Sequence, residues 1–189
     1  MRWLYPRFPP GRFAVVVRIA LLGMGLAAAY GAVHDQVSFT ISPEYFTKMK
    51  FHQFAWADVG LPPRLYASEI GALATWWVGL IGGWLLGRLG LAELPAEERR
   101  RRTVRAFAIV LGTAATGGLI GALVGLADGL GDLSGWAAWQ KGLDLHDLPA
   151  FVIVANLHAG GYLGALAGVV SAIVYVRRNR PKADSLPAL

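Results

Sequence analysis

Histidine and carboxylate side chains are the groups in this chain that could do chemistry. The sequence has 4 histidines, 12 Asp and Glu residues and no cysteine. The lack of cysteine excludes disulfides, thiolate metal sites, iron–sulfur clusters and cysteine nucleophiles. Imidazole and carboxylate together suit Zn, Fe, Mn or Cu. The candidate ligands, which four predicted helices and one loop could bring to a shared level, are His34, Asp35, Glu44, Glu69, Asp128 and His158.

Each main candidate ligand could also have a purely structural role, and the spacing of these residues in the sequence does not decide between the two roles. The N-terminal end of a helix and the nearby Ser68 could stabilise Glu69 without any ion. His158 could be a hydrogen-bonding residue between helices, and the adjacent His34 and Asp35 could be the polar end of a membrane span. No HExxH motif and no pair of histidines at helical spacing occurs, so a divalent metal site or a proton relay remains a hypothesis.

Other chemistries are less well supported. A b-type haem needs two axial ligands that face each other at matched depth. Only His158 is expected deep in a span, with His34 nearer the surface, so haem is disfavoured. Ser68 and Ser171 have no histidine partner visible in the sequence, and no GxSxG motif occurs. Catalytic residues therefore stay unknown, and a non-enzymatic role is favoured.

The elements that must position these residues are membrane-spanning helices. Hydrophobic residues make up 55% of the 189 residues and charged residues 16%, and the mean hydropathy is +0.46. A span of about 30 Å of hydrocarbon needs roughly 20 helical residues. Long apolar stretches occur at about 13–32, 64–89, 104–126 and 148–176. We therefore expect an all-α integral membrane four-helix bundle, one transmembrane domain over 1–189 with a cytoplasmic tail at 177–189.

The positive charges fix the expected orientation. Arginine and lysine concentrate before the first stretch, between the second and third, and after the fourth, namely Arg2, Arg7, Arg12, Arg88, Arg99, Arg100, Arg101, Arg102, Arg105, Arg177, Arg178, Arg180 and Lys182. Such clusters mark cytoplasmic segments, so both termini are expected in the cytoplasm. The small residues at 27–29 resemble a signal-peptide cleavage region, but the first apolar stretch is long and contains Arg18, so an uncleaved anchor is expected. The basic excess then reports topology, which argues against nucleic acid binding.

Small residues recur every four positions in each apolar stretch. The sets are Gly23, Ala27 and Gly31; Gly79, Gly83 and Gly87; Gly117, Gly121, Gly125 and Gly129; and Gly160, Gly164 and Gly168. Because burial of apolar surface does not drive helix association in lipid, close backbone approach at such ridges must do so. The ridges predict a tight bundle, and they also allow a homo-oligomer or docking to a larger complex.

Two loops are expected to hold short interfacial helices on the extracytoplasmic side. Ser42-Pro43-Glu44 is typical of a helix start, with a hydroxyl N-cap, proline at the first position and an acid in the first turn. A second short helix is expected after Ser134, before the fourth span. Glu69, six residues after Pro63, would lie about 9 Å down its helix, while His34 and Asp128 would cap the outer ends of their spans.

Three segments resemble a known group of proteins. Val33-His34-Asp35-Gln36, Ile41 through Phe46 (ISPEYF) and Asn156-Leu157-His158 resemble an uncharacterised family of small bacterial inner-membrane proteins. The resemblance implies a small polytopic bundle in the bacterial inner membrane, and it names no reaction.

Three functions are compatible with these patterns. The first is an outward-facing polar pocket that binds a divalent metal ion or relays protons. The second is a structural or assembly subunit that docks to a larger membrane complex through its glycine ridges. The third is a small homo-oligomeric channel or transporter, since four spans leave little room for a pathway within one chain.

Overall fold

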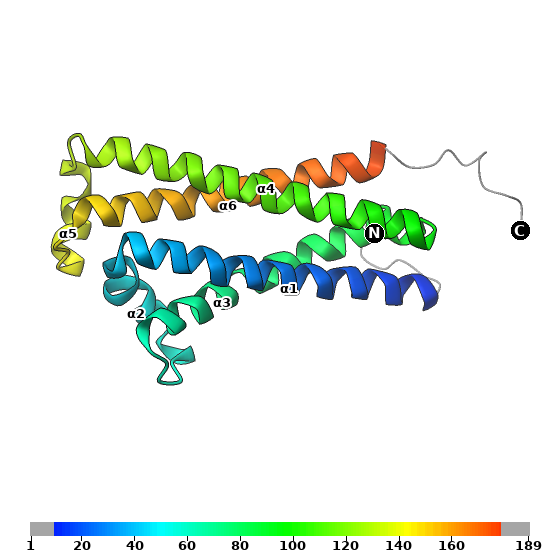
Figure 1. Ribbon diagram of the computed structural model, residues 1–189, viewed down its shortest axis with the longest axis horizontal. Coiled ribbons are helices and arrows are strands. Elements are labelled where there is room, and N and C mark those ends of the chain that lie inside the picture. The colour runs from blue at the N-terminus through cyan, green and yellow to red at the C-terminus, as the bar shows by residue number, and fades with distance from the viewer. Residues whose placement is uncertain (1–9, 179–189) are drawn as a thin grey trace, which may run out of the picture.

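Four long helices make up most of the protein. The computed structural model describes residues 10–178, and within that range the chain is helical without strands (Figure 1). The long helices are α1 (Pro10–Ile41), α3 (Pro63–Arg88), α4 (Ala96–Gly129) and α6 (Leu148–Arg178). All four are long and apolar enough to cross a membrane. The prediction of an all-α four-helix bundle is confirmed.

Short helical segments connect the long ones. They are η1 (Tyr45–Lys50), α2 (Phe51–Gln53), η2 (Ala55–Ala57), η3 (Leu91–Glu93), η4 (Ser134–Trp136) and α5 (Ala137–Leu143). At the predicted start after α1, the Ser42 hydroxyl oxygen accepts a hydrogen bond from the Tyr45 backbone N–H at 3.4 Å. Figure 1 shows α2 and α5 at the same end of the bundle, away from the start of α1 and the end of α6. We call this the α2–α5 end.

The bundle consists of two tightly packed helix pairs. The pair α1 and α3 forms the first hairpin and the pair α4 and α6 the second, with few contacts between the two. Glycines permit the close approach. A Cβ atom at Gly79 would overlap the carbonyl of Gly23 on α1, and one at Gly160 would overlap the carbonyl of Gly117 on α4. Gly71, two turns before Gly79, contacts Gly31 of α1 in the same way. The predicted use of glycine ridges to pack helices is confirmed, and these ridge residues face helices of the same chain.

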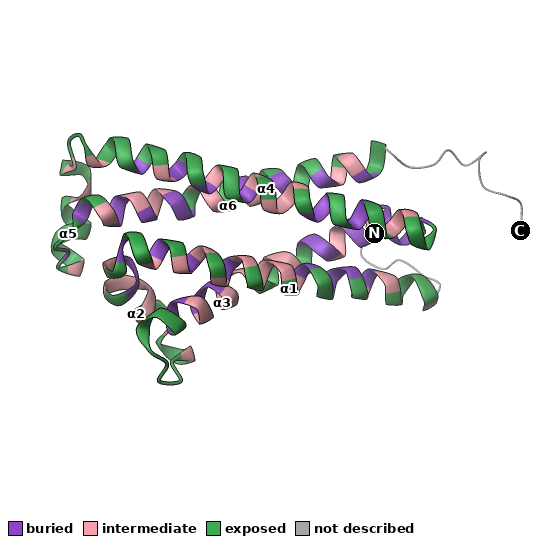
Figure 2. Cartoon of the chain, viewed as in Figure 1, coloured by how far each residue is buried: buried purple, intermediate pink, exposed green. Residues whose placement is uncertain are grey.

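Apolar clusters join the hairpins at both ends. One cluster, away from the α2–α5 end, includes Leu86 of α3, Phe107 of α4 and Val176 of α6. The other packs Tyr45 and Phe46 of η1 with Phe151 of α6 and neighbouring residues. Figure 2 shows exposed residues along the outer surfaces of the long helices. Many of these are large apolar side chains, such as Leu119, Leu123, Leu163 and Leu166, as expected of surfaces that face lipid.

Two helices extend beyond the predicted spans. The expected span at 13–32 continues as helix to Ile41, and that at 104–126 begins at Ala96 and ends at Gly129. His34 therefore lies inside α1 rather than capping its end, which corrects the expectation, and its depth is close to that of His158. Hydropathy marks where apolar residues stop, whereas the helix continues to the residue before Ser42. The tail at 179–189, with Arg180 and Lys182, and the N-terminal Arg2 and Arg7 lie outside the described residues.

Candidate metal centre

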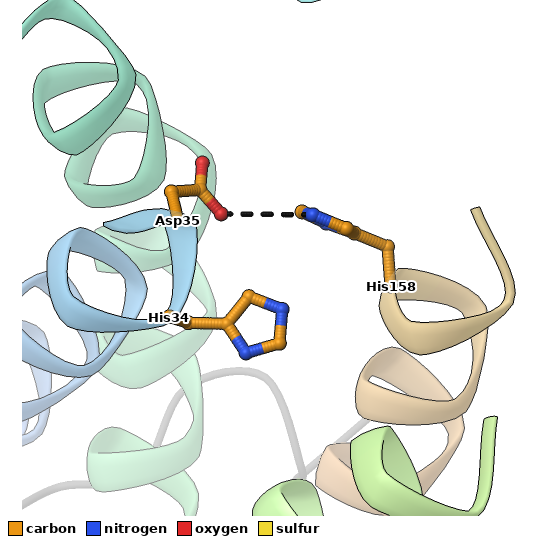
Figure 3. A group of neighbouring side chains, drawn as sticks. All are labelled: His34, Asp35 and His158. Carbon is orange, nitrogen blue, oxygen red and sulfur yellow. Dashed lines mark ion pairs between the residues drawn. The ribbon is translucent and has the colours of Figure 1, made fainter. Parts of the chain in front are cut away.

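Three of the predicted ligands meet where the two hairpins face each other. His34 and Asp35 are consecutive residues of α1, and His158 lies on α6 (Figure 3). His34 is seven residues before the end of α1, a rise of about 10 Å, and His158 is ten residues after the start of α6, about 15 Å. Both helices reach this level from the α2–α5 end, so the fold brings together side chains more than 120 positions apart in the sequence.

The three side chains are close enough to share one ion. One ligand atom from each lies within 4.8 Å of the others, and the His158 Nε2 is 3.7 Å from the Asp35 Oδ1. The two imidazole rings meet edge to face, with centroids 4.9 Å apart and planes at 84°. Figure 3 shows Asp35 and His158 pointing toward each other across the gap, with His34 beside them.

Burial makes this arrangement costly without a further partner. Asp35 is 4% exposed and His158 is 7% exposed, and the His158 Nε2 has no hydrogen-bond partner. A buried polar atom left without a partner costs about 1–3 kcal/mol, more so for a residue within a membrane span. The His158 Nε2 is therefore a buried nitrogen whose bonding capacity the described side chains leave unused.

Tyrosine rings hold the two imidazoles in place. Tyr30, one turn before His34 on α1, stacks on the His34 ring with centroids 5.6 Å apart. Tyr45 of η1 stacks on His158 at 4.8 Å, and Tyr162 lies one turn after His158 at 6.3 Å. Such contacts restrict the ring orientations. Tyr30 and Tyr162 are each four residues from a histidine of the cluster, and this helical spacing could have predicted that they contact the imidazole rings. No local sequence signal places Tyr45 at the site.

Lys50 adds a positive charge to the site. It is the last residue of η1, and it lies at the edge of the same cavity as Asp35 and His158. Burial lowers the pKa of Lys50, and the negative charge of Asp35 opposes that shift. Its ammonium nitrogen is 5.7 Å from the centre of the Tyr45 ring. The sequence predicts Lys50 only as part of the interfacial helix that begins at Ser42-Pro43-Glu44, because the approach of Lys50 to Asp35 depends on how η1 packs against the bundle.

A cavity of about 100 Å³ extends from the cluster between the two hairpins. All four long helices contribute to its wall, including Val78 of α3, Val110 of α4 and Val169 of α6. Its charged and imidazole side chains lie toward the α2–α5 end, and apart from the hydroxyl groups of Tyr30, Thr75 and Tyr162 the rest of the wall is apolar or glycine. The cluster is thus the polar end of an apolar space.

The other three predicted ligands do not line this cavity. The Glu44 carboxylate accepts hydrogen bonds from the backbone N–H groups of His146 at 3.1 Å and Asp147 at 2.9 Å, next to the start of α6. The Asp147 bond is the largest contribution that lowers the pKa of Glu44. Glu44 therefore stabilises a helix start, as a carboxylate does near helix N-termini.

Glu69 and Asp128 lie elsewhere. Glu69 is two residues before Gly71, which faces α1, so it is rotated by about 200° from that contact and points away from the first hairpin's interface. Its Oε2 is buried without a hydrogen-bond partner. Asp128 is exposed near the end of α4. The structure therefore brings together His34, Asp35 and His158, and it does not bring Glu44, Glu69 or Asp128 to them.

Comparisons of the chain with protein families, with curated proteins and with solved structures found no match. The resemblance of the HDQ and SPEYF segments to an inner-membrane family stays an expectation. The cluster of His34, Asp35 and His158 is therefore the feature of the protein that points to a function.

Proposed function

We propose that this protein is a polytopic membrane protein that binds a divalent transition-metal ion through His34, Asp35 and His158. The observation that carries the proposal is the buried His158 Nε2, which has no hydrogen-bond partner and lies 3.7 Å from the Asp35 carboxylate. An ionisable cluster inside a membrane span is costly and is normally retained for function. A bound cation would satisfy the imidazole nitrogens and the carboxylate together.

The donor set suits the first-row metals that accept nitrogen and oxygen ligands. Two imidazoles and one carboxylate occur at zinc sites with an open fourth position and at non-haem iron sites. Ligand atoms of a tetrahedral zinc site lie about 3.4 Å apart, for bonds of about 2.1 Å. The present separations of up to 4.8 Å require a small closure. Because His158 lies on the other hairpin from His34 and Asp35, binding would draw the two hairpins together.

We place the site in the outer half of the bacterial inner membrane, with both termini in the cytoplasm. This proposal rests on the arginines of the connection from α3 to α4, which include Arg99 through Arg102 and Arg105. Clusters of this kind are retained on the cytoplasmic side. The α2–α5 end then faces outward, and the cluster is about 10–15 Å below the outer ends of α1 and α6.

A proton relay through the same residues is the second candidate. The buried pair of Asp35 and His158, at 3.7 Å, could pass a proton to or from the cavity. The relay needs no metal, so metal analysis separates the two functions. The assembly-subunit alternative has less support, since the ridge glycines such as Gly79 and Gly160 face helices within the chain.

The test is metal binding by the full-length protein, purified in detergent and first treated with a chelator. We expect one Zn²⁺ or Co²⁺ per chain, and a cobalt complex with the intense visible bands of a low-coordinate site. His158→Ala and Asp35→Asn should each lower affinity at least about tenfold, the scale of one lost ligand interaction. His52→Gln and His146→Gln, which alter exposed histidines, serve as matched controls and should bind normally.

Two results would contradict the metal proposal. One is that the unaltered protein binds no stoichiometric metal. The other is that the control variants lose as much affinity as His158→Ala, which would show adventitious binding by surface imidazoles.

A further inference from the structure

We propose that the space between the two hairpins binds a single-chain anionic amphiphile. Its carboxylate or phosphate head group would lie at His34, Asp35, His158 and Lys50, and its chain would lie along the apolar cavity. This inference rests on the proposed metal site, because the ion supplies part of the positive charge that the head group meets.

The cavity has the length of one lipid-like chain, and its enclosed volume of about 100 Å³ accommodates part of that chain, with the remainder in the open part of the groove between the hairpins. Its wall on α1 extends from Gly23 to Asp35, and these twelve residues correspond to a rise of about 18 Å. Half of a bilayer's hydrocarbon core is about 15 Å thick. The space thus begins at the polar cluster and covers about the depth of one leaflet, which matches an amphiphile inserted head first at that end.

One glycine in the wall of the cavity leaves space for a chain, although helix packing does not require a glycine at that position. Gly82 lies on the wall of α3, and a Cβ atom there would meet only Val169, at an ordinary contact distance of 3.5 Å. The ridge glycines differ, since a Cβ atom at Gly79 would overlap the backbone of α1. Gly82 is therefore not needed for helix packing within its hairpin, and its missing side chain leaves volume between the hairpins.

Charge determines the kind of head group. With a divalent ion bound by two neutral imidazoles, the Asp35 carboxylate cancels one of its charges, and the Lys50 ammonium adds one. The site would then hold about two uncompensated positive charges inside a membrane span, which is unfavourable. A carboxylate or phosphate would occupy the open metal position, approach Lys50 and neutralise this excess. A neutral head group would not.

The test uses a defined probe, a photoactivatable diazirine analogue of hexadecanoic acid, with zinc-loaded full-length protein in phosphatidylcholine nanodiscs. After irradiation, mass spectrometry locates the labelled residues. We expect labels on cavity residues such as Val78, Val110 and Val169. The corresponding hexadecanol analogue should label them about tenfold less, equivalent to about 1.4 kcal/mol.

Two glycine variants make a matched pair. Gly82→Leu fills the cavity far from the cluster, so it should abolish cavity labelling and keep zinc binding. Gly112→Leu adds the same side chain at an exposed position of α4 with nothing within 4 Å, and it should leave labelling unchanged.

Three outcomes would overturn the inference. They are equal labelling of the cavity in Gly82→Leu, equal labelling by the acid and the alcohol, and labels confined to outward-facing residues, as expected if phospholipid or a second copy of the chain occupies the groove. Zinc binding that persists while the cavity stays unlabelled would refute this inference alone. Failure of the unaltered protein to bind zinc would instead refute the proposed function.

Discussion

Gly71→Ala tests how helix packing positions the candidate metal centre. A Cβ atom at Gly71 would lie 2.6 Å from the Gly31 carbonyl carbon and 3.0 Å from the Asp35 Cγ. Non-bonded carbons prefer about 3.5–4.0 Å, so α1 and α3 must separate by about 1 Å. Overpacking of this kind costs about 1–3 kcal/mol. Since alanine gains about 1 kcal/mol over glycine in a helix, the net loss should be up to about 2 kcal/mol.

The assay is unfolding in mixed micelles, followed by circular dichroism, with metal affinity measured in parallel. Gly112→Ala, on an exposed face with nothing within 4 Å, is the matched control and should be neutral or slightly stabilising. Gly71→Ala should also weaken zinc binding, because it displaces Asp35. If Gly71→Ala is as stable as Gly112→Ala and binds zinc normally, then the close contact of α1 and α3 does not position Asp35, and this reasoning is wrong.

Three further predictions concern stability and topology. Zinc at 100 times its Kd should raise the free energy of unfolding by about 2.7 kcal/mol, whereas a His158→Ala variant should show no such gain in the same titration. Glu44→Gln should lower the midpoint of thermal unfolding at pH 7. The pKa of Glu44 is lower in the folded state, so the Glu44 carboxylate stabilises the fold fully at pH values above its unfolded-state pKa of about 4.3. This stabilisation is lost as the pH falls through the folded-state pKa. A difference between the variant and the unaltered protein that persists at pH 3 would contradict this explanation. Because the chain has no cysteine, single cysteines report topology: a membrane-impermeant maleimide should label Asp132→Cys in intact cells and Arg100→Cys only after lysis, and the reverse pattern would invert the proposed orientation.

The helices could be predicted from the sequence because their signals are local. Apolar stretches and turn residues such as Ser42-Pro43 identify all four long helices and the short helix after α1. The end of α1 could not be predicted, because polar residues there look like the end of a span. Gln36 instead donates hydrogen bonds to the Ser68 hydroxyl at 2.7 Å and to the Arg64 carbonyl at 2.6 Å. Polar side chains of α1 can therefore lie within the helix rather than at its end, because α3 provides their hydrogen-bond partners.

The orientation of α6 was only partly predictable. Asn156 and His158 are two residues apart and so point about 200° apart, which predicts two different neighbours. In the structure, the backbone and Cβ atom of Asn156 pack against Gly121 and Gly125 of α4, while His158 faces α1. Both neighbours lie within the chain. The helical periodicity of the sequence predicts that Asn156 and His158 lie on different faces of α6, but it does not predict which helix packs against each face.

The composition of the site depends on long-range packing. Glycine spacing indicates that every long helix has a close neighbour, but it does not identify α1 with α3 or α4 with α6. The meeting of His34 and His158 follows from how the two hairpins face each other. The position of Lys50 follows from the π-helical turn of η1, for which the sequence has no clear signature. These are tertiary contacts, and local propensity carries no information about them.

The most direct measurement is X-ray absorption spectroscopy at the zinc edge of the zinc-loaded protein. We expect two imidazole nitrogens and at least one oxygen at about 2.0–2.1 Å, with one imidazole lost in His34→Ala and in His158→Ala. A first shell of oxygen atoms alone, or a shell with two imidazoles that survives either substitution, would contradict the claim that the two hairpins share one metal ion through His34, Asp35 and His158.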